Sequence, residues 1–128
     1  MSELIISVSG LRGIVGETLT EDVAARYAEA FAQTLPAGPV VVTRDGRANG
    51  PPLVAPLVAG LIAGGATEVL DGGVAATPTT GVLVREHRAV GGIQISASHN
   101  PAEYNGLKLF SADGRVIPGA RGQQVLDA

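Results

Sequence analysis

One short segment of the chain, residues 96–101, gathers polar side chains that could bind a phosphate and react with it. The segment reads Ser-Ala-Ser-His-Asn-Pro and follows an apolar stretch. Small residues allow a ligand to approach the backbone, and a turn that directs its amide N–H groups inward favours an anion. Ser98 adds a hydroxyl, while His99 and Asn100 add hydrogen-bond donors. The structural alternative is a polar turn whose serine and asparagine side chains bond only to nearby backbone.

Lys108 is the only lysine among the nine basic residues, and it follows Ser98 by ten positions. A lysine amine can lose its proton at a site that lowers its pKa, whereas an arginine guanidinium cannot. We therefore expect a proton-transfer role here, with a chance placement as the alternative. A serine hydrolase, with His99 as the base for Ser98, is a further reading. It is disfavoured because adjacent side chains on an extended backbone point apart, and because the chain lacks a Gly-x-Ser-x-Gly elbow.

Alternating strands and helices are expected to position these residues. The continuous run of valines at 40–42 is typical of a buried parallel strand. The sequence Ile-Gln-Ile at 93–95 predicts another strand just before the serine segment. Further strands are predicted at 4–8 and 67–70, and a hairpin with strands 108–110 and 115–117 is predicted to turn at Asp113-Gly114.

Three helices are predicted between these strands. The first begins at a capping box formed by Thr18 and Glu21 and has about four turns. A second helix is predicted at 53–63, where leucines recur on one face and a glycine pair follows. The third has Thr77 as its N-cap, is followed by proline at its first position, and runs to about His87.

This order of elements predicts a single α/β domain, a three-layer α/β/α sandwich around a mixed, mainly parallel sheet. The segments 9–16, 43–50, 71–77 and 96–106 are interpreted as loops, each of which follows a strand. In a parallel sheet such loops gather at one edge, which is where ligands usually bind. We therefore expect the serine segment to share an edge with the other three loops.

Residues 96–101 and 103–108 resemble the active-site serine segment of the α-D-phosphohexomutases, a family that includes phosphoglucomutase, phosphomannomutase and phosphoglucosamine mutase. Three further segments agree in order and spacing. Residues 9–13 are similar to the family's N-terminal arginine loop, residues 43–47 to its Gly-Arg-Asp-x-Arg segment with threonine in place of the glycine, and residues 71–79 to the stretch before its third helix. The resemblance implies that residues 1–128 are domain I of a longer enzyme, with the later domains absent from this chain.

The resemblance also implies a reaction, the interconversion of hexose 6-phosphate and hexose 1-phosphate, with glucose, mannose or glucosamine as the sugar. Ser98 would be phosphorylated, would pass its phosphoryl group to the substrate, and would take the other phosphate back from a bisphosphate intermediate. Arg12 would stabilise the transferred charge, and Lys108 would exchange a proton with the sugar hydroxyl. His99 and Asn100 would support the phosphoserine and Lys108.

Arg44 and Arg47 would orient the site, although an ion pair with Asp45 or another carboxylate explains them equally well. The resemblance implies Mg²⁺, with one ligand from Ser98 through its phosphate and the others from an Asp-x-Asp-x-Asp loop in the missing second domain. Hexose 1,6-bisphosphate would be the activator. We expect the chain to be inactive alone, with the remaining domains of the parent enzyme as partners. A non-catalytic sugar-phosphate or anion-binding domain is the alternative.

The overall composition excludes several other classes of protein. Of the 128 residues, 45% are hydrophobic and 16% are charged, as in a domain with a real core. A net charge of -3 without a basic run gives no expectation of nucleic-acid binding. The lack of cysteine excludes disulfides, thiolate metal sites and cysteine nucleophiles. No apolar run is long enough for a membrane helix and no signal peptide is recognisable, so a cytoplasmic protein without a membrane partner is expected.

Overall fold

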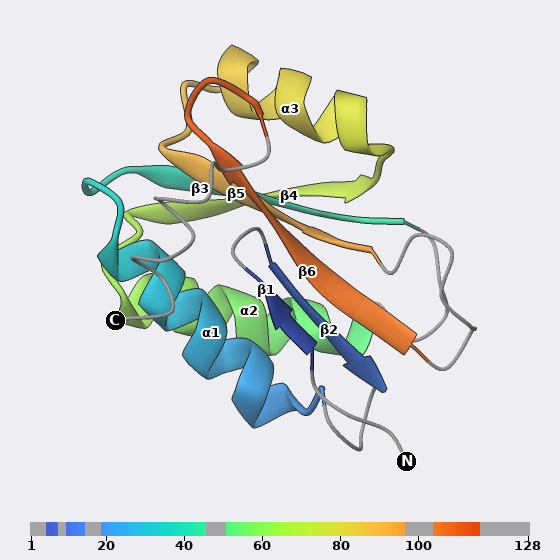
Figure 1. The fold of residues 1–128 in the computed structure, drawn as a ribbon. Coiled ribbons are helices and arrows are strands. Elements are labelled where there is room, and N and C mark those ends of the chain that lie inside the picture. The colour runs from blue at the N-terminus through green and yellow to red at the C-terminus, as the bar shows by residue number, and fades with distance from the viewer. Residues whose placement is uncertain (1–4, 8–9, 15–18, 46–50, 97–103, 116–128) are drawn as a thin grey trace.

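The computed structural model of the chain describes residues 5–7, 10–14, 19–45, 51–96 and 104–115 (Figure 1). Within these residues a six-stranded sheet is covered by helices on both faces, with the strands in the order β1-β2-β6-β5-β3-β4. The strands are β1 (Ile5–Ser7), β2 (Gly10–Ile14), β3 (Pro39–Arg44), β4 (Glu68–Val74), β5 (Gly91–Ile95) and β6 (Tyr104–Ser111), and the helices are α1 (Glu21–Gln33), α2 (Pro51–Ala63) and α3 (Thr77–Glu86).

Helices α1 and α2 pack against each other on one face of the sheet, and α3 lies on the other face (Figure 1). In the sheet, β3 is parallel to both of its neighbours, β4 and β5, whereas β5–β6, β6–β2 and β2–β1 are antiparallel pairs. The three-layer α/β/α sandwich with a mixed sheet is therefore confirmed. Three of the five strand pairs in the described sheet are antiparallel, so it is less parallel than predicted, because a segment interpreted as a loop pairs as a strand beside β6.

The valine run of β3 is buried on both faces of the sheet. Val40 and Val42 belong to the larger core, which lies between the sheet and helices α1 and α2. Val41 belongs to a smaller core beneath α3, together with Val84 of α3 and Phe110 of β6. Burial on both faces explains why this strand is a continuous apolar run and not an alternation. The predicted buried parallel strand is confirmed.

Residues 10–14 form strand β2, so the prediction of a loop there is wrong. β2 pairs antiparallel with β1 on one side and with β6 on the other. Ladder hydrogen bonds on both sides stabilise a stretch that Gly10 and Gly13 make a poor strand by local propensity. β3 and β6 likewise extend into predicted loops, by residues 43–44 and 104–106.

Strand β4 continues past the glycine pair that the sequence pattern indicates as its end. Val42 of β3 pairs with Asp71, but Thr43 pairs with Gly73, so Gly72 is the extra residue of a β-bulge. Gly73 has a φ of +70°, a backbone conformation that favours glycine. The glycine pair therefore bends the strand without ending it.

The three helices lie where the sequence pattern predicts them, but two N-caps differ. Thr20, not Thr18, is the N-cap of α1, and its Oγ1 accepts a hydrogen bond from a backbone N–H of the first turn at 3.2 Å. Thr18 itself lies outside the described residues. The N-cap of α3 is Ala76, whose backbone is extended, and Thr77 is the first residue of the helix; the Thr77 hydroxyl donates a hydrogen bond to Gln94 at 2.8 Å. Both capping predictions are therefore wrong.

The predicted turn at Asp113-Gly114 follows β6. Gly114 has a φ of +82°, and the backbone N–H of Ser111 donates to the carbonyl of Arg115 at 2.8 Å. The Ser111 hydroxyl also donates to the Asp113 carboxylate, which lowers the pKa of that carboxyl below its ordinary value. The turn is confirmed. Arg115 is not in a strand, and residues 116–117 of the predicted second strand lie outside the described residues.

Candidate functional site

Strands β3, β4 and β5 end at one edge of the sheet, and β6 begins there. Arg44, the last residue of β3, pairs with Ile95 at the end of β5 and with Val74 at the end of β4. Ile95 pairs in turn with Leu107, near the start of the antiparallel β6. β2 is antiparallel to β6 and also ends at this edge. Segments far apart in the sequence therefore meet here. Parts of the predicted loops are strand, at residues 10–14, 43–44, 71–74 and 104–106, whereas residues 46–50 and 97–103 lie outside the described residues.

Lys108 lies in β6 between two partner strands, opposite Gln94 of β5 and Gly10 of β2. Leu107 and Leu109 on either side belong to the larger core beneath α1 and α2. Because successive side chains of a strand alternate between faces, Lys108 is on the opposite face, the side of α3. Its side chain is half-buried, and no carboxylate of the described residues forms an ion pair with it. The ammonium group is therefore available to an anion from outside this part of the chain.

Arg12 reaches the same region through β2. Its backbone pairs with Gly106 of β6 on one side and with Ile5 of β1 on the other. Gly106 precedes Lys108 by two positions, so the two basic residues lie on neighbouring strands. The residue type indicates Lys108 and the family resemblance indicates Arg12, but only the β2–β6 register brings the two together.

Arg44 ends β3, and its side chain is partly exposed. Its carbonyl oxygen accepts a hydrogen bond from the Ala75 N–H at 2.9 Å. The next residue, Asp45, donates its backbone N–H to Ile95 at 2.9 Å, which fixes the end of β3 to β5. No carboxylate within the described ranges forms an ion pair with Arg44. Arg47 lies outside the described residues, and its role stays a prediction.

Ser98, His99 and Asn100 also lie outside the described residues, so their roles stay predictions. The structure does show where their segment leaves the sheet. Ser96 directly follows β5 and donates its backbone N–H to the Gly106 carbonyl at 2.9 Å. The serine segment therefore starts at the end of β5, and the chain rejoins the sheet at the start of β6, the strand that carries the lysine.

Residues 4–128 match the family model described as "Phosphoglucomutase/phosphomannomutase, alpha/beta/alpha domain I". The chain belongs to this family. Similar proteins include the phosphoglucosamine mutase of Synechococcus sp. (strain WH7803), 39% identical over 137 residues, and the probable phosphoglucosamine mutase of Methanopyrus kandleri, 45% identical over 109 residues. These alignments cover 99% and 85% of this chain but 29% and 24% of the two relatives, so the chain spans less than a third of their length.

Solved structures share the fold of this phosphoglucomutase/phosphomannomutase domain I. A putative phosphomannomutase from Thermus thermophilus matches with a TM-score of 0.86 and 32% identity, over 98% of this chain and 30% of that one. A phosphoglucomutase/phosphomannomutase family protein from Burkholderia thailandensis matches with a TM-score of 0.81 and 34% identity, over 96% of this chain and 30% of that one. The predicted resemblance to the phosphohexomutases is confirmed.

Domain I also holds a buried polar network that the sequence pattern does not reveal. The Gln94 side chain bonds to Thr77 and to the Ala75 carbonyl, and the hydroxyls of Thr43 and Thr80 are 2.7 Å apart. A polar residue between two isoleucines usually faces solvent, but Gln94 is only 1% exposed. The sequence feature that could have indicated this network is a single glutamine in an otherwise apolar strand.

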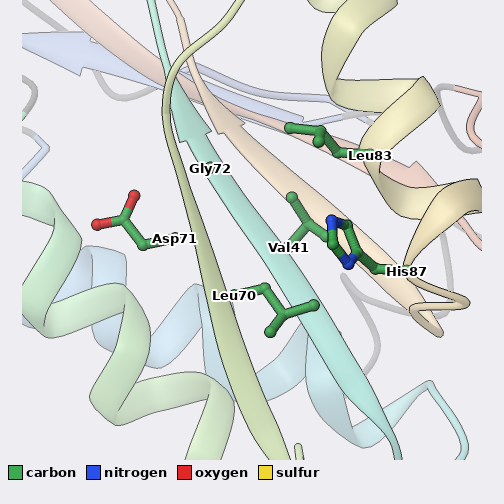
Figure 2. Close-up of a pocket in the computed structure, with 6 residues that line it drawn as sticks. All are labelled: Val41, Leu70, Asp71, Gly72, Leu83 and His87. Atoms are coloured by element: carbon green, nitrogen blue, oxygen red, sulfur yellow. The ribbon is translucent and has the colours of Figure 1, made fainter.

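A shallow pocket lies away from the candidate site, between α3 and β4 (Figure 2). Its volume is about 220 Å³. The Asp71 carboxylate points away from His87 and accepts a hydrogen bond from the Gly73 N–H at 2.8 Å. One imidazole without a second converging polar group does not make a reactive site. The lining residues are Val41, Leu70, Asp71, Gly72, Leu83 and His87.

In the ranges that the structure describes, no group of three or more His, Asp or Glu side chains is placed to hold a metal ion. The Mg²⁺ implied by the resemblance therefore has no complete protein site in this part of the chain. In the same part, no helix is both long enough and apolar enough to cross a membrane.

Proposed function

We propose that this chain is the phosphoserine-bearing domain I of a mutase that interconverts hexose 6-phosphate and hexose 1-phosphate. The observation that carries the proposal is the register of β6. It puts Lys108 beside β2 and β5, at the edge where the Ser98 segment leaves the sheet. Family membership supports the reaction class. The names of the curated relatives make glucosamine phosphate the first substrate to test.

In the proposed cycle, Ser98 enters as its phosphate ester. The bond between phosphorus and the Ser98 Oγ breaks as a hydroxyl oxygen of the hexose monophosphate bonds to phosphorus, which gives a bisphosphate. The hydroxyl proton passes to the Lys108 amine and then to the Ser98 Oγ, so that protons balance. The sugar reorients, and the same steps run in reverse with its other phosphate. In each half of the cycle Lys108 is thus the general base for the attacking hydroxyl and the general acid for the leaving oxygen.

The phosphoryl group spreads negative charge over its equatorial oxygens during transfer, and positioned cations stabilise that charge. We assign this role to Arg12, whose forked guanidinium can bond to two oxygens at once. Arg44 and Arg47 are proposed to bind the substrate and its phosphate together with Asn100. His99 is proposed to support the phosphoserine.

Mg²⁺ would be held by an oxygen of the Ser98 phosphate and by carboxylates of the parent enzyme's second domain. When bound, it would neutralise charge on the phosphoryl group. Hexose 1,6-bisphosphate would phosphorylate Ser98 and so start the cycle. Because the described residues offer no acidic cluster, we propose that the isolated chain is inactive and that the other domains of the parent enzyme are its partners.

Alanine substitution of Ser98 in the full-length enzyme tests this function. Turnover would be assayed with glucosamine, glucose and mannose phosphates in the presence of Mg²⁺ and hexose 1,6-bisphosphate. Ser98→Ala should abolish turnover, whereas Ser111→Ala, at the far end of β6, should retain most of it. Turnover that survives in Ser98→Ala would overturn the proposal. Binding of hexose phosphate without turnover, in the wild type and in Ser98→Ala alike, would support the non-catalytic binding domain.

A further inference from the structure

A buried side-chain amide lies beside the candidate site. Gln94 of β5 is 1% exposed, and both polar atoms of its amide have partners. Its Oε1 accepts a hydrogen bond from the Thr77 hydroxyl at 2.8 Å, and its Nε2 donates to the Ala75 carbonyl at 2.9 Å. A buried amide costs free energy unless it is bonded in this way, so the orientation of the Gln94 side chain is closely fixed.

The partners of Gln94 belong to the connection between β4 and α3. The N–H of Ala75 in this connection donates to the Arg44 carbonyl at 2.9 Å. One turn into α3, the Thr80 hydroxyl contacts the Thr43 hydroxyl of β3 at 2.7 Å. The start of α3 is therefore fixed to β3 by Ala75 and Thr80, and to β5 by the Gln94 side chain.

Gln94 is also next to both reactive segments of the proposed mutase. It lies directly opposite Lys108 in the β5–β6 ladder, and it precedes Ser96, where the serine segment leaves the sheet, by two positions. Cβ atoms of directly opposite residues in antiparallel strands are about 4.5–5.5 Å apart and on the same face. A shift of β5 against α3 would therefore move the start of the serine segment and the strand of Lys108 together.

We propose that Gln94 is a positioning residue for phosphoryl transfer, which it serves by locking β5 to the start of α3 through Thr77. In this role it fixes β5, and with it the paired strand of Lys108, relative to the β4–α3 connection that is bonded to Arg44, without touching the substrate. The inference rests on the proposed mutase function. Thr43 and Thr80 form a comparable buried bond between α3 and β3, but that bond does not involve the β5–β6 pair, so it supplies a matched control.

The test compares three variants of the full-length enzyme. Gln94→Met keeps the size of the side chain but removes its hydrogen bonds, and Thr77→Val removes one of them with a smaller change. For both we expect kcat to fall by about tenfold or more, because small displacements of reacting groups are costly, while KM for the hexose phosphate stays nearly constant. Thr80→Val, which removes the Thr43–Thr80 bond from the α3 side, should lower the thermal midpoint of unfolding but leave kcat near the wild-type value.

The outcomes separate this inference from the function on which it rests. If Gln94→Met and Thr77→Val lose thermal stability but keep kcat, as Thr80→Val is expected to do, Gln94 is purely structural and the inference is wrong. If Gln94→Met fails to fold, Thr77→Val alone decides, by the same criterion. A wild-type enzyme without mutase turnover would overturn the proposed function, and the inference with it.

Discussion

Lys108 and Gln94 lie directly opposite each other on β6 and β5, so the only lysine of the chain neighbours a buried amide. The amide is bonded to the start of α3, while no carboxylate of the described residues pairs with the ammonium group. The lysine therefore has a neutral, fixed neighbour across the ladder and no counter-ion in this part of the chain. In this arrangement the ammonium group of Lys108 is available to bind an anionic ligand.

Substitution of Lys108 by arginine separates charge from proton transfer. In the full-length enzyme, Lys108→Arg should lower kcat by about 100-fold or more, because guanidinium does not give up its proton. KM for the hexose phosphate should change little, since the cation is kept. Lys108→Ala should impair both kcat and KM. Steady-state kinetics, with thermal unfolding as the control for folding, would show this. A near wild-type kcat in Lys108→Arg would contradict a proton-transfer role.

The close approach of α1 and α2 at Gly60 predicts an unusual effect of alanine. A Cβ at this position would collide with the carbonyl oxygen of Ala25. Alanine normally favours a helix over glycine by about 1 kcal/mol, but here overpacking should dominate and lower the free energy of unfolding by about 1–3 kcal/mol. The control is Ala59→Gly at the exposed neighbouring position, which should cost about 1 kcal/mol through propensity alone. In urea unfolding, a stabilised Gly60→Ala would contradict this helix contact.

Tyr27 predicts a pH dependence of stability. Its hydroxyl is buried without a hydrogen-bond partner, and burial raises the pKa of Tyr27 from 10.0 to about 12. As pH rises, the unfolded chain loses this proton before the folded chain does. The free energy of unfolding is therefore unaffected by Tyr27 ionisation below pH 10.0 and decreases as pH rises to about 12. Tyr27→Phe should remove the decrease in stability that Tyr27 ionisation causes at high pH. At neutral pH it should raise the free energy of unfolding by about 1 kcal/mol, because no buried hydroxyl is left without a partner. Denaturant unfolding of both proteins would measure this, and the same pH dependence in both would show that the hydroxyl is not buried.

Local sequence patterns are sufficient to predict an element when its own apolar residues determine which of its faces are buried. The valines at 40–42 are apolar on every face, and β3 is buried on both sides. The helical periodicity of 21–33 likewise suffices for α1, which packs its apolar stripe on α2 and the sheet. The same patterns fail at Thr77, because the helix begins one residue earlier than they predict, with Ala76 as the extended N-cap residue.

Features that depend on distant partners could not be predicted from local patterns. Gly10 and Gly13 indicate a loop until β6 provides a partner strand, and the β4 bulge at Gly72 depends on its register with β3. For the candidate site, the residue type of Lys108 predicts proton transfer, whereas Arg12 is predicted only through the family resemblance. That the two residues lie on neighbouring strands follows only from the β2–β6 register, which cannot be predicted from a local sequence pattern.

The phosphorylation state of Ser98 tests the central claim most directly. The full-length enzyme would be incubated with hexose 1,6-bisphosphate and Mg²⁺, and the peptide that contains Ser98 would be analysed by mass spectrometry before and after excess hexose monophosphate is added. We predict one phosphate on Ser98 after the bisphosphate treatment and its transfer to the monophosphate afterwards. A Ser98 that never carries phosphate, in an enzyme that still interconverts the two hexose phosphates, would contradict the proposed function.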